Sequence, residues 1–218
     1  MTLKPKITHR FTLPFSLLLI ILTVLWLKPA SALALGNAPA LPTFIDFSKS
    51  VQNGQKDILR GVYVANVLAL PIVQQPSGKD SYVSGQDGKV TQFNMPSKYG
   101  NIGLLAHNHL AGKFFSQLAV GQEVKLIYGD GHIEVFVIKE VLEYQALQPT
   151  SPYSSFKNLN KAETLTATQM FQRVYLGDHH LTFQTCIKSN GESSWGRLFI
   201  IAVPKTLPDR YNDQADFT

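Results

Sequence analysis

The sequence has only one cysteine, Cys186, in its 218 residues. A single cysteine cannot close a disulfide bridge within its own chain, so this thiol is free or pairs with another molecule. No internal repeat is evident along the chain either. The thiol therefore has two main interpretations, which are a buried packing residue and a nucleophile.

The chain also lacks an excess of positive charge outside its N-terminus. It carries 20 Lys and Arg and 15 Asp and Glu, but residues 1–32 contain four of the cationic side chains and none of the acidic ones. The rest of the chain has 16 cationic and 15 acidic side chains, which is a net charge of +1. Because nucleic-acid binding needs a basic patch on the folded domain, this balance argues against a nucleic-acid partner.

Residues 1–32 have the layout of an export signal. A basic start precedes an apolar run over residues 11–27, and Ala30-Ser31-Ala32 offers a small-x-small cleavage site. The densest apolar part, residues 17–27, is shorter than the roughly 20 residues of a membrane-spanning helix. We expect a cleaved signal peptide or, if the longer run just spans a bilayer, an uncleaved N-terminal membrane anchor. In both cases the folded part is extracytoplasmic, either secreted or anchored at the cell surface.

The 186 residues that follow residue 32 have a length that fits one domain with a sizeable core. Residues 33–43 contain several Ala, Leu and Pro and are interpreted as a linker. We therefore predict one domain over residues 44–207, followed by a C-terminal tail over residues 208–218.

Most of the predicted elements in this domain are strands. The predicted strands cover residues 61–73, 90–93, 102–106, 124–128, 132–142, 181–187 and 198–203. One helix is predicted over residues 164–175, where Thr166 can cap the N-terminus. Residues 74–88 are expected to form a surface loop, and residues 145–161 a long insert that is a candidate functional segment. Many short strands and one or two short helices predict a mainly β protein with a closed β-barrel.

The strand over residues 181–187 carries the cysteine. Because side chains alternate along a strand, Cys186 shares the more polar face with Thr182 and Gln184. Arg197 lies 11 residues further on, at the start of the last predicted strand. If these two strands form an antiparallel pair, Arg197 lies opposite Cys186, where its permanent charge can stabilise a thiolate or an oxyanion.

Three segments resemble the sortases, which are exported and often membrane-anchored bacterial cysteine transpeptidases. These are His107 after Leu104-Leu105-Ala106, Cys186 in Thr182-Phe183-Gln184-Thr185-Cys186, and Arg197 in Trp195-Gly196-Arg197. The family signature at the nucleophile is Thr-Leu-x-Thr-Cys, so Phe183 stands in place of the leucine. The resemblance covers roughly residues 60–204, with His, Cys and Arg in the family's order.

The resemblance implies an eight-stranded sortase-like barrel and a two-step acyl transfer. Cys186 would attack a sorting-motif peptide of the Leu-Pro-x-Thr-Gly kind and form a thioacyl enzyme, which an amine or water releases. His107 would act as the general acid and base, and Arg197 would position the substrate and stabilise the oxyanion. The implied partners are a peptide of an exported protein and an amine acceptor from the cell wall or a pilin-like protein. No cofactor is implied.

Other interpretations of these residues stay open at this point. His107 and His109 could share one face of a strand and bind a metal, as in a cupin-like barrel, although no acidic third ligand follows over residues 110–122. A sortase-like module that binds without catalysis is a second alternative. Each residue also has a structural role to consider: Cys186 as buried packing, Arg197 in a surface ion pair and His107 as a strand-end histidine.

Overall fold

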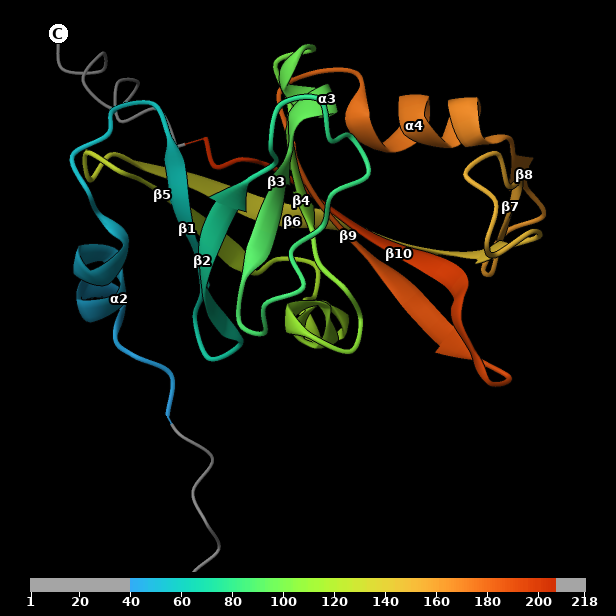
Figure 1. Cartoon of the computed structure of the whole chain (residues 1–218), viewed down its shortest axis with the longest axis horizontal. Coiled ribbons are helices and arrows are strands. Elements are labelled where there is room, and N and C mark those ends of the chain that lie inside the picture. Colours follow the sequence, from blue (N-terminus) through green and yellow to red (C-terminus); the bar gives the residue numbers. More distant parts are fainter. Residues whose placement is uncertain (1–39, 207–218) are drawn as a thin grey trace, which may run out of the picture. The chain divides into compact units, whose positions relative to one another are not determined.

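The computed structural model describes residues 40–206, shown in colour in Figure 1. The predicted signal or anchor (1–32), most of the linker (33–43) and the tail (208–218) lie outside these residues. Residues 41–206 belong to one compact unit. Over the described part, no helix has the length and apolar character needed to cross a bilayer.

Ten strands and four short helices make up the described chain. In order they are α2 (Phe44–Val51), β1 (Leu59–Val64), β2 (Leu68–Gln74), β3 (Val90–Phe93), α3 (Asn94–Ser97), β4 (Ile102–Leu105), the 3-10 helix η1 (Ala111–Gln117), β5 (Glu123–Tyr128), β6 (Ile133–Ala146), β7 (Phe156–Asn158), β8 (Thr164–Leu165), α4 (Ala167–Tyr175), β9 (Leu181–Ser189) and β10 (Glu192–Pro204).

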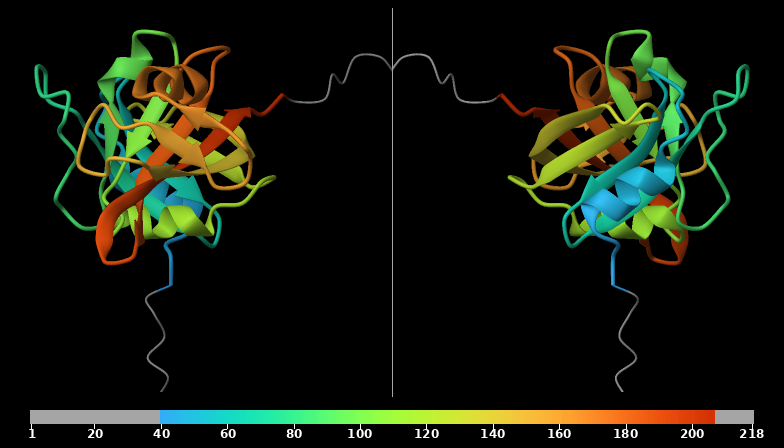
Figure 2. Two further views of the ribbon diagram at one scale, coloured as in Figure 1. Left: turned by 90° about the vertical axis from the view of Figure 1, so that its right-hand side faces the viewer. Right: turned by 90° about the vertical axis from the view of Figure 1, so that its left-hand side faces the viewer.

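Eight of these strands close into a barrel, as predicted. The strand order is β10-β9-β4-β3-β2-β1-β5-β6, and β6 pairs again with β10. The closing β6–β10 ladder runs from Gly196 opposite Gln145 to Pro204 opposite Phe136. Closure leaves no free edge within these eight strands. The short strands β7 and β8 continue from β6 outside the closed part (Figures 1 and 2).

The barrel interior holds the main hydrophobic core. Inward-facing side chains alternate along the strands, so Leu181 and Phe183 of β9 are fully buried beside Leu198 and Ile200 of β10. A second cluster lies outside the barrel, where α4 covers the outer face of β6 and β10. There, Met170 and Val174 pack with Phe199. Both faces of β10 are therefore buried along part of its length.

Helix α4 begins and ends close to the predicted bounds. Thr166 is its N-cap and forms a reciprocal capping box with Gln169, which satisfies two backbone donors at the helix start. Arg173 also joins the helix to β6, because its Nη2 lies 2.6 Å from both carboxylate oxygens of Glu140. These contacts fix α4 over the outer face of the sheet.

Three features differ from the sequence prediction. The predicted strand 61–73 is a hairpin, β1 and β2, because Asn66 takes a left-handed conformation (φ 61°) in the three-residue turn between Val64 and Leu68. Strands β9 and β10 also extend further than predicted, to a tight turn at Asn190 and Gly191. The structure has more short helices than expected, since α2, α3 and η1 were not predicted.

Helix α2 packs against the β1–β2 side of the barrel through Phe47, which is buried. Phe47 and Val51 fit there because Gly61 has no side chain: a Cβ at this position would lie 2.9 Å from Val51 Cγ2 and 3.0 Å from Phe47 Cε1. Thr43 caps the helix by accepting a hydrogen bond from the Asp46 backbone N–H at 3.2 Å.

Candidate active site

Cys186 and Arg197 are direct cross-strand partners in the antiparallel β9–β10 pair. Paired residues point to the same side of a sheet, with Cβ atoms about 4.5–5.5 Å apart. The side chains of Cys186 and Arg197 face out of the barrel, because their neighbours along the strands, Thr185 and Leu198, face inward. Both Cys186 and Arg197 are partly exposed. The predicted pairing of thiol and guanidinium is therefore present in the structure.

Backbone oxygens hold the Arg197 guanidinium. Its Nη1 donates hydrogen bonds to the carbonyls of Ser194 at 2.8 Å and Gly196 at 2.9 Å, and its Nη2 donates to Pro149 O at 3.4 Å. Gly196 is required for the close approach of β6, since a Cβ there would lie 2.6 Å from Tyr144 O. A guanidinium has five N–H donors, so donors remain for a substrate oxygen.

Hydrogen bonds from Ser194 also lower the pKa of the Glu192 carboxyl, with a smaller contribution from the charge of Arg197. Glu192 accepts from the Ser194 backbone N–H at 2.9 Å and from its hydroxyl at 2.8 Å. Glu192 is therefore an anion at neutral pH, in the same β9–β10 hairpin that carries the guanidinium.

His107 follows β4, which lies next to β9 in a parallel pair with Leu105 opposite Gln184. The two chains stay together beyond that point: the Ala106 backbone N–H donates to Gln184 O at 3.2 Å, and the Thr185 hydroxyl donates to Ala106 O at 2.8 Å. His107 lies two residues after Leu105, and Cys186 lies two residues after Gln184. The backbone of His107 is thus held alongside β9 close to the thiol-bearing residue.

His109 lies in the turn after β4 rather than on the strand. Its ring stacks with that of His107, with centroids 5.5 Å apart and planes inclined by 29°. Among residues 40–206, no group of three His, Cys, Asp or Glu side chains is arranged to hold a metal ion. The described residues therefore supply no third ligand for a metal ion bound by His107 and His109.

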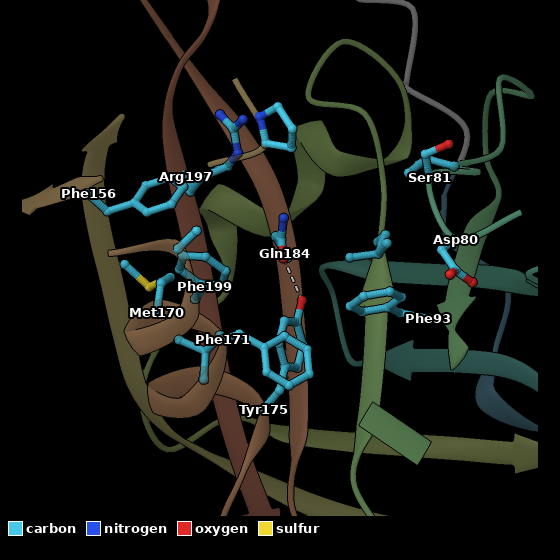
Figure 3. A pocket seen from close by; sticks show the side chains of 15 residues that line it. Asp80, Ser81, Phe93, Phe156, Met170, Phe171, Tyr175, Gln184, Arg197 and Phe199 are labelled. Carbon is cyan, nitrogen blue, oxygen red and sulfur yellow. Dashed lines mark hydrogen bonds between the residues drawn. The ribbon is translucent and has the colours of Figure 1, made fainter. Parts of the chain in front are cut away.

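An aromatic pocket of about 300 Å³ lies along the outer face of β9 and β10 (Figure 3). Its lining includes Arg197 and Gln184 from these strands and Leu105 from β4. Five rings line it: Phe93, Phe156, Phe171, Tyr175 and Phe199. The aromatic pocket, as we call this cavity, is therefore suited to an apolar side chain beside a guanidinium.

Helix α4 forms one wall of the aromatic pocket and is tied to its floor. The Tyr175 hydroxyl donates to Gln184 Oε1 at 2.5 Å, as the dashed line in Figure 3 marks. Burial raises the pKa of Tyr175, so its hydroxyl keeps its proton and remains a donor at neutral pH. Val174 O also accepts from the Thr182 hydroxyl at 2.6 Å, which gives a second link to β9.

The loop between β2 and β3 forms the opposite wall and contributes Asp80, Ser81 and Val83. Gln75, which is 4% exposed, organises this loop from inside. Its Nε2 donates to the carbonyls of Asp80 at 2.9 Å and Tyr82 at 3.1 Å, and its Oε1 accepts from the Asn94 backbone N–H at 3.1 Å. The predicted surface loop 74–88 is therefore an ordered wall.

A second pocket, of about 510 Å³, lies on the side of β9 and β10 toward which Thr185 and Leu198 face, and Cys186 is among the residues that line it. It is lined by Asn108, His109, Gly112, Lys113, Ser116, Glu143, Thr185, Cys186, Ile187, Lys188, Ser193 and Leu198. We call it the lysine pocket after Lys113 and Lys188. Asn108 closes one side by donating from Nδ2 to Ser193 O at 2.8 Å, which joins the turn after β4 to the β9–β10 hairpin.

Sequence reasoning found the thiol and the guanidinium but missed both pockets. A helix was predicted over residues 164–175, yet the sequence gave no sign that Phe171 in that helix lines a cavity. The wall residues from the β2–β3 loop have no local pattern that could have identified them. Their positions depend on the buried Gln75, whose hydrogen-bond partners are set only in the folded chain.

The fold and site together define a closed β-barrel with a partly exposed thiol beside a guanidinium on its outer face. No protein-family model matches the chain, and no curated protein matches its sequence. The solved structures similar to it include three sortases, from the family that the sequence motifs resemble.

Sortase A from Listeria monocytogenes has 11% identity and a TM-score of 0.44, covering 68% of this chain and 88% of its own. The Clostridium perfringens sortase D5 transpeptidase has 14% identity and a TM-score of 0.43, covering 74% and 88%. Sortase C1 from Streptococcus suis has 11% identity and a TM-score of 0.47, covering 77% and 83%. Since identities and TM-scores are low, the roles of individual residues rest on the geometry of this chain.

Proposed function

We propose that this protein is an extracytoplasmic cysteine transpeptidase of the sortase kind, with Cys186 as its nucleophile. The observation that carries the proposal is the cross-strand pairing of Cys186 with Arg197, a residue that also lines a cavity of about 300 Å³. A cysteine nucleophile needs a nearby positive charge and donors for the oxyanion that forms on attack. The guanidinium can supply both.

In the first step, the Cys186 thiolate attacks the carbonyl carbon of a peptide bond. A C–S bond forms, and the carbonyl oxygen becomes an oxyanion that the remaining Arg197 donors stabilise. His107 then gives a proton to the amide nitrogen, the C–N bond breaks and the amine product leaves. A thioacyl enzyme and a neutral imidazole remain.

In the second step, an amine attacks the thioester carbon and passes a proton to His107. The new C–N bond forms, the C–S bond breaks and the sulfur leaves as thiolate with its bonding electrons. Water can replace the amine, and the product is then a carboxylic acid. The enzyme returns to its starting protonation state, so neither an oxidant nor a reductant is needed.

The aromatic pocket suits the acyl side of the substrate. A sorting motif of the Leu-Pro-x-Thr kind presents two apolar residues ahead of the cleaved bond, and the pocket's rings can bury them. The proposed substrate is therefore such a motif in an exported protein, and the acceptor is an amine of the cell wall or of a pilin-like protein. Such substrates fit the export signal that residues 1–32 predict.

The test is cleavage of a panel of sorting-motif peptides carrying a fluorophore and a quencher across the Thr-Gly bond. We expect the wild-type protein to cleave at least one peptide and Cys186→Ala to cleave none, while keeping the wild-type melting temperature. If wild-type protein cleaves no peptide, or if Cys186→Ala cleaves as fast as wild type, the proposal is wrong.

A further inference from the structure

The aromatic pocket depends on the C-terminal end of α4, where the last backbone carbonyls have no partner within the helix. Two of these carbonyls accept hydrogen bonds from buried side chains of the barrel. Val174 O accepts from the Thr182 hydroxyl at 2.6 Å, and Tyr175 O accepts from Asn101 Nδ2 at 2.9 Å. Because Val174 and Tyr175 both line the aromatic pocket, these bonds fix one wall of the pocket to the barrel.

Asn101, which immediately precedes β4, is 1% exposed and uses both ends of its amide. Its Nδ2 also donates to Gly177 O at 3.4 Å, and its Oδ1 accepts from the His180 backbone N–H at 2.8 Å. One side chain thus holds the turn between α4 and β9 at three points. The same partners fix the orientation of the amide, since the reversed amide would turn its oxygen toward two carbonyl oxygens.

Tyr175 connects this turn to the interior of the aromatic pocket. Its backbone carbonyl is held by Asn101, and its hydroxyl donates to Gln184 Oε1. Between these two ends, its ring packs against the rings of Phe93 and Phe171, with centroids 5.4 and 5.3 Å apart. All three rings line the aromatic pocket. A shift of the turn between α4 and β9 would therefore move the rings that surround a bound side chain.

Asn101 is remote from the reacting atoms. The next residue, Ile102, pairs with Leu181 of β9, and Cys186 lies five residues further along that strand. At about 3.3 Å per residue, this separation is about 16 Å along the sheet, so Asn101 does not reach the thiol or the bond that it attacks. Any influence of Asn101 on the reaction has to pass through the wall of the aromatic pocket.

We propose that Asn101 is a positioning residue that sets the preference of the aromatic pocket for a large apolar side chain of the substrate. This inference rests on the proposed transpeptidase function. Without the amide, Tyr175 O and the His180 N–H would lose a buried hydrogen-bond partner, and the turn would move to satisfy them. The rings would then enclose the substrate side chain less closely, while the chemistry at Cys186 would be unchanged.

The test compares two fluorogenic peptides: a sorting-motif peptide that the wild-type protein cleaves, and the same peptide with its leucine replaced by alanine. The readout is the ratio of their kcat/KM values, in which changes in the ionisation of the thiol or the base cancel. We expect wild-type protein to favour leucine by about 30-fold, because leucine buries up to three more carbon atoms than alanine. In Asn101→Ala this ratio should fall by roughly tenfold, through a higher KM for the leucine peptide at an unchanged kcat.

Val62→Ala is the control for a general loss of stability. Val62 of β1 is fully buried in the barrel core and lines neither the aromatic pocket nor the lysine pocket. Its truncation leaves a cavity that destabilises the barrel, but the variant should keep the wild-type ratio. Urea denaturation and circular dichroism measure the stability and folding of each variant.

Asn101→Asp tests the hydrogen bonds themselves. A protonated carboxyl can donate to Tyr175 O and still accept from the His180 N–H, whereas a carboxylate can only accept. The leucine-to-alanine ratio of Asn101→Asp, divided by the wild-type ratio at the same pH, should therefore be higher at about pH 5 than at about pH 8.

The outcomes separate this inference from the proposed function. If Asn101→Ala keeps the wild-type preference, if Val62→Ala loses it equally, or if the ratio of Asn101→Asp does not change with pH, Asn101 does not position the pocket. If both Asn101 variants are unfolded, Asn101 supports the whole barrel and the inference is also wrong. If wild-type protein cleaves both peptides equally well, the inference fails but the proposed function stands. If it cleaves no peptide, the proposed function fails as well.

Discussion

Gly112 joins η1 to the two segments that carry the candidate site, and replacing it with alanine tests how tightly that junction is built. A Cβ at this position would lie 2.7 Å from His107 O and 2.9 Å from Ala106 O, and closer still to the Thr185 hydroxyl oxygen. Two of these atoms are backbone, and the hydroxyl is buried and donates to Ala106 O. None can move aside by a simple side-chain rotation.

The added methyl group must therefore push η1 away or shift the segment after β4. Overpacking of this kind costs about 1–3 kcal/mol of unfolding free energy. It also stretches the hydrogen bond from the Gly112 N–H to His107 O, which is 3.0 Å long. A displacement of about 1 Å at a catalytic group can lower the rate about 100-fold. We thus expect Gly112→Ala to lose both stability and peptide cleavage.

Gly85→Ala is the matched control. Gly85 lies in the β2–β3 loop, has no positive φ, and a Cβ added to it would meet no atom within 4 Å. The free energy of unfolding of Gly85→Ala should lie within about 0.5 kcal/mol of the wild-type value. Urea denaturation gives the stabilities, and cleavage of the fluorogenic peptide gives the rates. If Gly112→Ala matches Gly85→Ala in both measurements, the reasoning about this junction is refuted.

Three further predictions concern the site. Arg197→Lys should keep the charge but lose the fork of donors, so kcat for peptide cleavage should fall about 100-fold, and an unchanged kcat would contradict its oxyanion role. His107→Ala should abolish cleavage whereas His109→Ala should retain it, and the opposite result in the same assay would reassign the base to His109. Tyr175→Phe should lower the free energy of unfolding by about 1 kcal/mol near pH 8, because the hydrogen bond to Gln184 is lost. Because burial raises the pKa of Tyr175, the stability from its protonated hydroxyl is present below about pH 10 and is lost as the pH rises further. The difference between wild type and Tyr175→Phe in urea denaturation should therefore shrink above about pH 10, and a constant difference would contradict this.

Much of the barrel follows from local patterns in the sequence. The strand β3, the β5–β6 hairpin and the helix α4 with its Thr166 cap have the predicted bounds to within a few residues. The β1–β2 hairpin was missed because only Asn66 interrupts a continuous apolar run, and a single asparagine is a weak turn signal. Helix α2 was missed because its eight residues are short and are stabilised by the packing of Phe47 over Gly61.

The candidate site was predictable where it depends on strand register. Alternation along β9 gave the face of Cys186, and the antiparallel return of the chain gave Arg197 as its partner. The pockets were not predictable, because their walls come from segments far apart in the sequence. Phe93, Phe156 and Phe171 meet around one cavity only after the barrel has closed. Whether His107 acts as the base stays a prediction.

The most direct test of the central claim is the mass of the intact protein during reaction with a sorting-motif peptide. We predict that wild-type protein gains the mass of the acyl fragment, that digestion locates this mass on Cys186, and that adding an amine removes it. Cys186→Ala should gain nothing under the same conditions. If the protein cleaves the peptide without such an adduct, or if the adduct lies on another residue, Cys186 is not the nucleophile.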